Sequence, residues 1–523
     1  MSEQGRVAEK SERTLTRGIM SWHVSLIALG GIIGSCYFLG LSETFNEMGP
    51  GAVIVAYIIA GITIYGVMQS FAELLVNIPR RGSFVSYTRE FMGDTAATGI
   101  GWAFWVNWVF YIPSEALATG VFMNYFVKLP FSAATSALIW GIVALAVLTL
   151  VNIFQVKWFG HIESILAIIK IAAVVMFIVC AVLIWLGFIG SDLHPYTEEG
   201  GFIGLKVMLG GTGSTMSKLF PFGGIVIVSW MIWTLVNFQG SEIVGLSAAE
   251  TQDPAKNIPV ACKKVAYRII AIYLIPVCLL ALLVPYYEAN LDMSLFTQCL
   301  SLYGLKWCAG IFTLVTLVAA FSCANSGLYG TVRSMYGLSV EGMAPQFLSN
   351  LNRFNVPMNA TLFTIVPVWV VFMFMFMIQE LGMLGGEGNP IYVILLGASG
   401  FTGTLCWVGI CWSQVVFRRR LRQRGYDPQE CLTVKAQLYP GLEVFAIVLQ
   451  IAAMIMLVFE DQLVFWACVI IIAASIGIYA LQKKRGKIRQ VVTLGEDEVL
   501  FDEKFPPLPG SEAEKKLQEK NSK

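Results

Sequence analysis

Residues 28–36 read Ala28-Leu29-Gly30-Gly31-Ile32-Ile33-Gly34-Ser35-Cys36 and lie inside a long apolar stretch. Three glycines within five residues weaken a helix, because each costs roughly 1 kcal/mol relative to alanine. Close packing against a neighbouring helix would be one sufficient reason for these glycines. An interrupted helix is the alternative, and a matching interruption elsewhere in the chain would favour it.

A second apolar run, residues 225–246, contains the polar stretch Asn237-Phe238-Gln239-Gly240-Ser241-Glu242. A carboxylate in the middle of a membrane is costly, and close packing does not explain it. Two interrupted spans, one early in each half of the chain, indicate a secondary transporter built from inverted repeats, with its ligand bound at the breaks.

The composition also indicates a membrane protein. Of the 523 residues, 56% are hydrophobic and only 13% are charged, whereas about a quarter of the residues in soluble domains are charged. This excludes a soluble enzyme, a nucleic-acid binder and a disordered scaffold, and it makes the lipid bilayer a partner. The cysteines form no CxxC pair and no nucleophile–base set converges, so we expect no metal, no cofactor and no enzymatic activity.

The apolar runs predict an all-α membrane protein with twelve transmembrane helices, the first and sixth of them broken. Spans one to five form a first repeat (22–189), and an outer loop with spans six to ten forms the second (190–417). An inner loop and spans eleven and twelve follow (418–482). The ends are an N-terminal segment (1–21) and a charged C-terminal tail (483–523), expected to be mobile. The spans are 22–41, 51–76, 97–126, 132–154, 161–189, 222–247, 264–286, 305–336, 360–379, 391–417, 441–459 and 463–482.

Lysine and arginine gather in alternate loops, for example at residues 418–424 and 483–487, whereas the intervening loops are acidic or neutral. The positive-inside rule then places both termini in the cytoplasm. We expect a multi-pass protein of the plasma membrane, which is the inner membrane in a Gram-negative cell. The sequence predicts no particular oligomeric state.

Unwound backbone inside a membrane leaves N–H and C=O groups that need partners. A zwitterionic ligand supplies both, since its carboxylate accepts from N–H groups at a half-helix start and its ammonium donates to carbonyls. The ligand's own side chain would then point toward Glu115, Asn325 and Ser399. The expected substrate-binding backbone comprises Gly30, Gly31, Ile33, Gly34 and Ser35 in the first break and Phe238, Gln239 and Gly240 in the second.

These residues resemble a known family. Gly30-Gly31-Ile32-Ile33-Gly34, followed by Glu47-Met48-Gly49-Pro50-Gly51, is similar to the first span of amino-acid permeases in the amino acid–polyamine–organocation superfamily. Residues 238–246 and 250–259 resemble that family's sixth span and its following loop. Gly82-Ser83-Phe84, Asn325-Ser326-Gly327 and Ala344-Pro345 fall where the bacterial amino acid transporter family carries like motifs. The resemblance covers about residues 17–485, and it departs from the family at Ser35-Cys36-Tyr37.

The resemblance implies a five-plus-five inverted repeat, substrate at both breaks and proton-driven amino-acid uptake. Phe238-Gln239-Gly240 resembles lysine and arginine permeases more than aromatic ones. A carboxylate facing the ligand's side chain would also favour a cationic amino acid, although relatives that carry neutral amino acids also have an acid in span three. The alternatives are an amino-acid or amine exchanger, a neutral amino-acid permease, and a channel or sensor of similar fold.

Four charged residues inside the spans are candidates for coupling or gating. Lys170 is buried in span five, where burial lets a lysine gain and lose a proton; in proton-coupled relatives a similar lysine lies against the first break. Its alternative role is a structural ion pair. Glu115 either holds a substrate ammonium, carries the coupling proton or packs against hydroxyl groups. Glu242 either caps free N–H groups after the second break or handles protons, and Glu73 pairs with loop arginines as a gate element.

Overall fold

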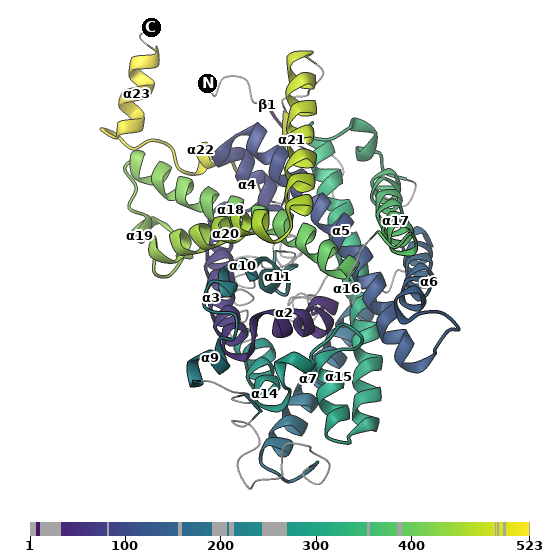
Figure 1. Ribbon diagram of the computed structural model, residues 1–523. Coiled ribbons are helices and arrows are strands. Elements are labelled where there is room, and N and C mark those ends of the chain that lie inside the picture. Colours follow the sequence, from purple (N-terminus) through teal and green to yellow (C-terminus); the bar gives the residue numbers. More distant parts are fainter. Residues whose placement is uncertain are drawn as a thin grey trace.

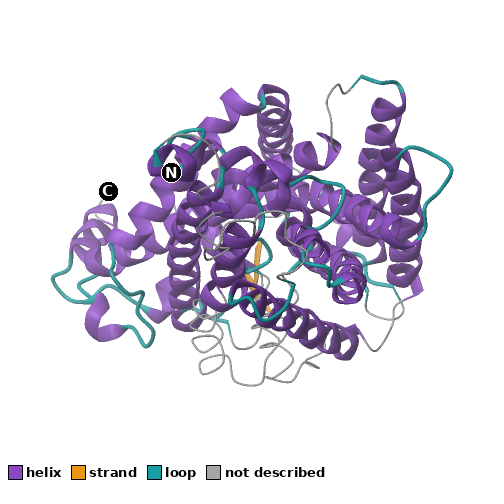
Figure 2. Cartoon of the chain, turned by 60° about the horizontal axis from the view of Figure 1, so that its bottom comes forward, coloured by secondary structure: helices purple, strands orange, loops and turns teal. Residues whose placement is uncertain are grey.

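The computed structural model describes residues 7–10, 33–80, 83–154, 159–190, 207–208, 214–242, 269–352, 356–383, 390–486, 488, 491–494 and 498–521. These residues form a bundle of helices (Figure 1). One short parallel pair of strands joins β1 (Val7–Lys10) to β2 (Val491–Leu494), and it stands out among the helices in Figure 2. Gly30 and Gly31 lie outside the described residues.

Long apolar helices make up most of the bundle. Within the described residues, eight helices are long and apolar enough to cross a membrane, which supports the expected helical membrane protein; the strand pair lies outside these helices. They are α3 (Pro50–Asn77), α6 (Ala133–Phe154), α7 (Phe159–Trp185), α16 (Lys306–Val340), α17 (Met358–Glu380), α18 (Pro390–Gln423), α20 (Gly441–Glu460) and α21 (Gln462–Lys484).

Helix α5 (Asp94–Phe126) packs along α6, α16 and α18. It approaches α16 closely because Gly327 has no side chain: a Cβ there would lie 1.8 Å from Cζ3 of Trp108. At such a distance only glycine fits. This close packing places the middle of α5, including Glu115, in the interior of the bundle, where the Glu115 side chain is fully buried.

Short helices occupy the middle of the bundle at both expected breaks. After the non-helical Ile33 and Gly34, the chain forms the π-helix η1 (Cys36–Gly40) and then α2 (Leu41–Met48). At the other break, α10 (Val226–Ser229) and α11 (Met231–Val236) end in turns over residues 237–242. Helices α10 and α11 both contact α2, and Figure 1 shows the three surrounded by longer helices.

The remaining elements connect or cover these helices. They are α4 (Ser83–Met92), α9 (Thr215–Leu219), η3 (Ile269–Leu274), α14 (Ile275–Leu283), η4 (Tyr286–Glu288), α15 (Leu295–Leu302), η5 (Gln346–Ser349), α19 (Pro428–Cys431), α22 (Phe501–Lys504) and α23 (Glu512–Asn521).

The expectation of a mobile C-terminal tail is wrong for residues 498–510, which dock onto one end of the bundle. Phe501 is fully buried and Phe505 is 5% exposed. The Phe501 ring packs against Phe91 of α4 and Phe417 of α18, with ring centroids 5.6 and 5.8 Å apart. Two aromatic residues one helical turn apart thus give the tail an apolar face. The charged average composition of the tail does not reveal this face.

Polar contacts hold the same segment. Arg424 forms an ion pair with Asp502, and its Nη1 donates to the Phe505 carbonyl at 2.6 Å. Lys504 donates to the Asn77 carbonyl at the end of α3, and burial lowers the pKa of Lys504 below its usual value. The tail therefore connects the ends of α3, α4 and α18.

Candidate functional site

A buried carboxylate fills the first break. The Ser35 N–H donates to both oxygens of Glu115, at 3.0 and 2.9 Å. Ser35 and Glu115 are both fully buried. The first free N–H of a half helix thus binds a carboxylate, which is the interaction expected of an anionic group at a helix start.

Other side chains complete the wall of this break. The Ser35 hydroxyl lies 2.8 Å from the Tyr392 hydroxyl of α18. The thiol of Cys36 lies 2.9 Å from the Tyr111 hydroxyl of α5, and it also donates to the Val236 carbonyl at the end of α11, at 3.7 Å. Cys36 therefore connects the first break to the helix that leads into the second.

Gly34 is required by the space around it. A Cβ at Gly34 would lie 2.3 Å from Oε1 of Glu115, 2.8 Å from Sγ of Cys323 and 2.9 Å from the Tyr111 hydroxyl. Real Cβ atoms essentially never approach so closely. The missing side chain lets Glu115 reach the Ser35 N–H.

A carboxylate also binds backbone at the second break. The Gly240 N–H donates to both oxygens of Glu242, at 3.1 and 3.2 Å, and the Trp407 indole donates to Glu242 at 3.0 Å. Gly240 has φ of +91°, a conformation that glycine adopts without a steric penalty. The Phe238 ring is buried, with its centroid 4.8 Å from that of Tyr273.

Gln239 and Ser399 meet next to the second break. Gln239 Nε2 donates to the Ser399 carbonyl at 3.1 Å, and the Ser399 hydroxyl lies 2.9 Å from Oε1 of Gln239 and 2.5 Å from Oδ1 of Asn107. Nδ2 of Asn107 is buried and has no hydrogen-bond partner among the described residues. Because an unpaired buried donor is costly, this amide is a candidate contact for a ligand.

Asn325 was expected in the pocket, but its side chain is bonded to a neighbouring helix. Its Oδ1 accepts from Nδ2 of Asn152 in α6, at 2.7 Å. Cys323 stands two residues earlier on α16, which is nearly the opposite side of a helix, and Cys323 is the residue that lies beside Gly34. The structure therefore brings Ser35 and Glu115 together, and Gln239 with Ser399, but directs Asn325 toward α6.

Lys170 belongs to a buried polar group that includes Ser322 and Glu163. Its Nζ donates to the Ser322 hydroxyl at 2.9 Å and lies 3.9 Å from Oε1 of Glu163. Ser322 in turn donates to Glu163 at 2.5 Å. The exposed fractions of the Lys170 and Glu163 side chains are 1% and 2%. Ser322 precedes Cys323, so this group adjoins the wall of the first break.

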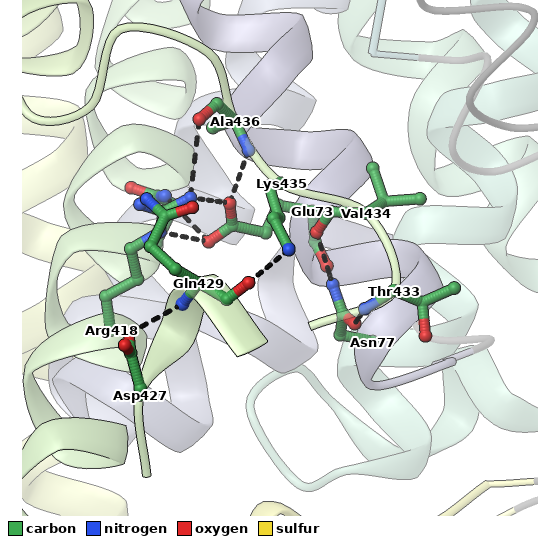
Figure 3. A network of polar contacts seen from close by, with 10 residues as sticks. Glu73, Asn77, Arg418, Asp427, Gln429, Thr433, Val434, Lys435 and Ala436 are labelled. Carbon is green, nitrogen blue, oxygen red and sulfur yellow. Dashed lines mark hydrogen bonds and ion pairs between the residues drawn. The ribbon is translucent and has the colours of Figure 1, made fainter. Parts of the chain in front are cut away.

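Glu73, near the C-terminal end of α3, forms an ion pair with Arg418. Arg418 donates through Nε at 2.7 Å and also through Nη2, Gln414 donates at 2.9 Å, and the Ala436 N–H donates at 2.6 Å (Figure 3). Glu73 and Arg418 are both fully buried. The contacts join α3, α18 and the segment before α20 into one network.

Comparison with known proteins identifies the family. The model of the amino acid permease family matches residues 23–485. The chain belongs to the amino acid permease family. It is 31% identical to the lysine-specific permease LysP of Escherichia coli (strain K12), over 83% of this chain and 85% of that protein. It is 30% identical to a basic amino-acid permease of Saccharomyces cerevisiae (strain ATCC 204508 / S288c), over 84% and 74%. It is 28% identical to a gamma-aminobutyric acid permease of Bacillus subtilis (strain 168), over 87% and 90%.

As a member of this family, the permease is a multi-pass membrane protein that transports amino acids. Sequence reasoning missed Tyr111 and Asn107 as parts of its candidate site. Both precede Glu115 at intervals of four residues, so all three share one face of α5. That spacing was the available signal. Glu163 precedes Lys170 by seven residues on α7, and Tyr392 precedes Ser399 by seven on α18, so helical spacing was a signal for these two as well. Trp407 carried no such signal.

Proposed function

We propose that this permease imports an amino acid by proton symport, with a preference for cationic amino acids. The observation that carries the proposal is the contact of the Glu115 carboxylate with the Ser35 N–H at the first break. A helix start that binds one carboxylate in the protein suits the α-carboxylate of a substrate equally well. The backbone around Gly30 to Gly34 and Phe238 to Gly240 would supply the remaining contacts.

The proposed architecture is the twelve-span, five-plus-five inverted repeat with both termini in the cytoplasm. Support comes from the two interrupted segments, which each lie at the middle of the bundle and each bind a carboxylate through backbone N–H. Alternation of basic and acidic loops supports the orientation. In that orientation, the Glu73–Arg418 pair lies at the cytoplasmic end and acts as a gate element.

Substrate binding would proceed by exchange of carboxylates. The substrate α-carboxylate replaces Glu115 at the Ser35 N–H, and Glu115 then faces the cationic part of the substrate. A lysine or arginine substrate gains most from this rearrangement, because its side chain carries a second cation. The unpaired Nδ2 of Asn107 offers a further donor beside the second break.

Proton coupling is assigned to Lys170, with Glu115 as the second candidate. Lys170 is buried and adjoins Ser322 and Cys323, so a change in its protonation alters hydrogen bonds next to the wall of the first break. Glu163 is its ion-pair partner and makes a purely structural role the alternative. If Lys170 couples protons, its loss should remove the response to a proton gradient; if its role is structural, the response should remain.

The test uses purified permease in liposomes without internal substrate, with an imposed inward proton gradient. Labelled lysine should accumulate in wild type, and Lys170→Ala should abolish the response to the gradient while substrate binding remains. Lys306→Ala, which removes an exposed lysine at the start of α16, is the matched control and should behave as wild type. Gradient-driven accumulation by Lys170→Ala at the wild-type level would move the coupling role elsewhere, with Glu115 next.

The same liposomes separate a symporter from an exchanger. An obligatory exchanger moves no labelled substrate into empty vesicles and requires internal amino acid or amine. Competition by all common amino acids then defines the substrate. If lysine and arginine do not compete in wild type, the cationic preference is wrong and a neutral amino-acid permease remains.

A further inference from the structure

The C-terminal end of α18 carries basic side chains on an outer face that transport does not use. A cavity of about 460 Å³ lies there, bounded by Val415, Arg419, Arg422 and Gln423 of α18, by Tyr439 before α20, and by Glu512 of α23. Arg419 and Arg422 are exposed. Among the described residues, neither guanidinium has a carboxylate within salt-bridge distance. Arg418, by contrast, points inward to Glu73.

The face of α18 that leads to this cavity changes from apolar to basic. Residues seven apart return to the same side of a helix after two turns. Trp412, which is 47% exposed, therefore lies in line with Arg419, and Val415 lies in line with Arg422. An exposed tryptophan below two arginines is the arrangement found where a helix leaves the hydrocarbon and enters the headgroup layer.

The segment that contributes Tyr439 to the cavity also carries exposed apolar side chains. Leu438 is 79% exposed with φ of +58°, a conformation that leucine rarely adopts. Val444 and Val448, one turn apart on α20, are 50% and 61% exposed. An apolar surface close in sequence to Tyr439, together with two exposed arginines at the cavity, points to an amphipathic neighbour.

We propose that this cavity binds a phospholipid with an anionic headgroup. The phosphate lies between Arg419 and Arg422, whose planar guanidinium groups match phosphate oxygens in pairs, and Tyr439 lines the headgroup. The acyl chains run along Trp412, Val444 and Val448. Free phosphate satisfies the arginines but leaves this apolar surface uncovered, so the lipid is the better occupant.

A lipid at this site would affect Glu73 through Arg418, and its affinity would depend on Glu512. Arg419 follows Arg418, so a lipid held on the outside fixes the helical turn that holds Glu73 on the inside. Glu512 places a carboxylate on the rim of the cavity. Because like charges repel, Glu512 weakens binding of the headgroup, and Glu512→Gln should strengthen it.

Native mass spectrometry of the full-length permease with phosphatidylglycerol and phosphatidylcholine tests the proposal. Wild type should retain phosphatidylglycerol preferentially. R419Q/R422Q should bind it roughly 25-fold more weakly, at about fivefold for each arginine near a membrane surface. K484Q/R485Q removes two positive charges from exposed positions at the C-terminal end of α21 and should retain lipid as wild type does. Equal loss in both double variants, or no loss in R419Q/R422Q, overturns the proposal.

Two further measurements distinguish loss of lipid binding from loss of folding, and a lipid from free phosphate. Thermal unfolding in phosphatidylcholine alone should be the same for all variants, and added phosphatidylglycerol should raise Tm in wild type but not in R419Q/R422Q. If R419Q/R422Q fails to fold, the single variant R422Q takes its place. Displacement of the lipid by an excess of inorganic phosphate would show a site for free phosphate and overturn the lipid assignment.

Discussion

At each of the two breaks of this permease, a backbone N–H donates to a carboxylate, but the two carboxylates come from different parts of the chain. At the first break, Ser35 N–H donates to Glu115, which lies 80 residues away on α5. At the second, Gly240 N–H donates to Glu242, two residues further along the same segment. Both carboxylates are buried and both contact one N–H through two oxygens.

The difference lies in what each contact requires. Glu242 is tied to Gly240 by the chain itself, so its carboxylate stays at the N–H whatever the other helices do. Glu115 reaches Ser35 only while α5 and the first break keep their present positions. Glu242 is a local cap, whereas Glu115 comes from another helix, and we propose that the substrate carboxylate displaces it. We therefore assign Glu242 to stability and Glu115 to substrate binding.

The largest effect is expected from Glu115→Gln. Lysine uptake should fall about 10- to 150-fold, since hydrogen bonds to charged groups contribute about 1.5–3 kcal/mol. Initial uptake rates over a range of lysine concentrations measure this. Wild-type kinetics in Glu115→Gln would remove Glu115 from the substrate site.

Gly34→Ala should lower uptake by about tenfold or more, because forcing a methyl group into a packed site costs about 1–3 kcal/mol. The added Cβ would collide with Glu115, Cys323 and Tyr111. Gly477→Ala is the matched control, since nothing lies within 4 Å of a Cβ at that position in α21. If the two variants transport equally well, the first break is not as tightly enclosed as the contacts indicate.

Glu242→Gln should lower stability but, unlike Glu115→Gln, leave the affinity for substrate unchanged. The free energy of unfolding should fall by about 1.5–3 kcal/mol because the Gly240 N–H and the Trp407 indole lose a charged acceptor. The apparent affinity for lysine should stay at the wild-type value. Thermal unfolding and uptake competition on one preparation test both parts, and a change of substrate preference would contradict a structural role.

The smallest effect is expected from Asn325→Ala. Asn325 accepts a hydrogen bond from Asn152 on α6. We expect uptake to change by less than about fivefold, in line with the loss of one neutral hydrogen bond worth about 1 kcal/mol. A loss as large as that in Glu115→Gln would place Asn325 in the substrate path.

The helices and the polar positions in them could be predicted from the sequence, because length, apolar runs and glycine clusters are local properties. The partner of Glu115 could not, since nothing near residue 115 indicates Ser35. For the same reason the direction of Asn325 was not predictable: it depends on which face of α16 meets α6. The docked tail was missed because two phenylalanines are few in a charged segment, yet both are buried.

Competition by lysine and by lysine amide for uptake into wild-type liposomes tests the exchange of carboxylates most directly. The amide keeps both cationic groups and replaces only the α-carboxylate. If the substrate carboxylate replaces Glu115 at the Ser35 N–H, lysine should compete strongly and the amide should compete at least about tenfold more weakly. Equal competition by the two compounds would contradict the account, because the first break would then not bind the carboxylate.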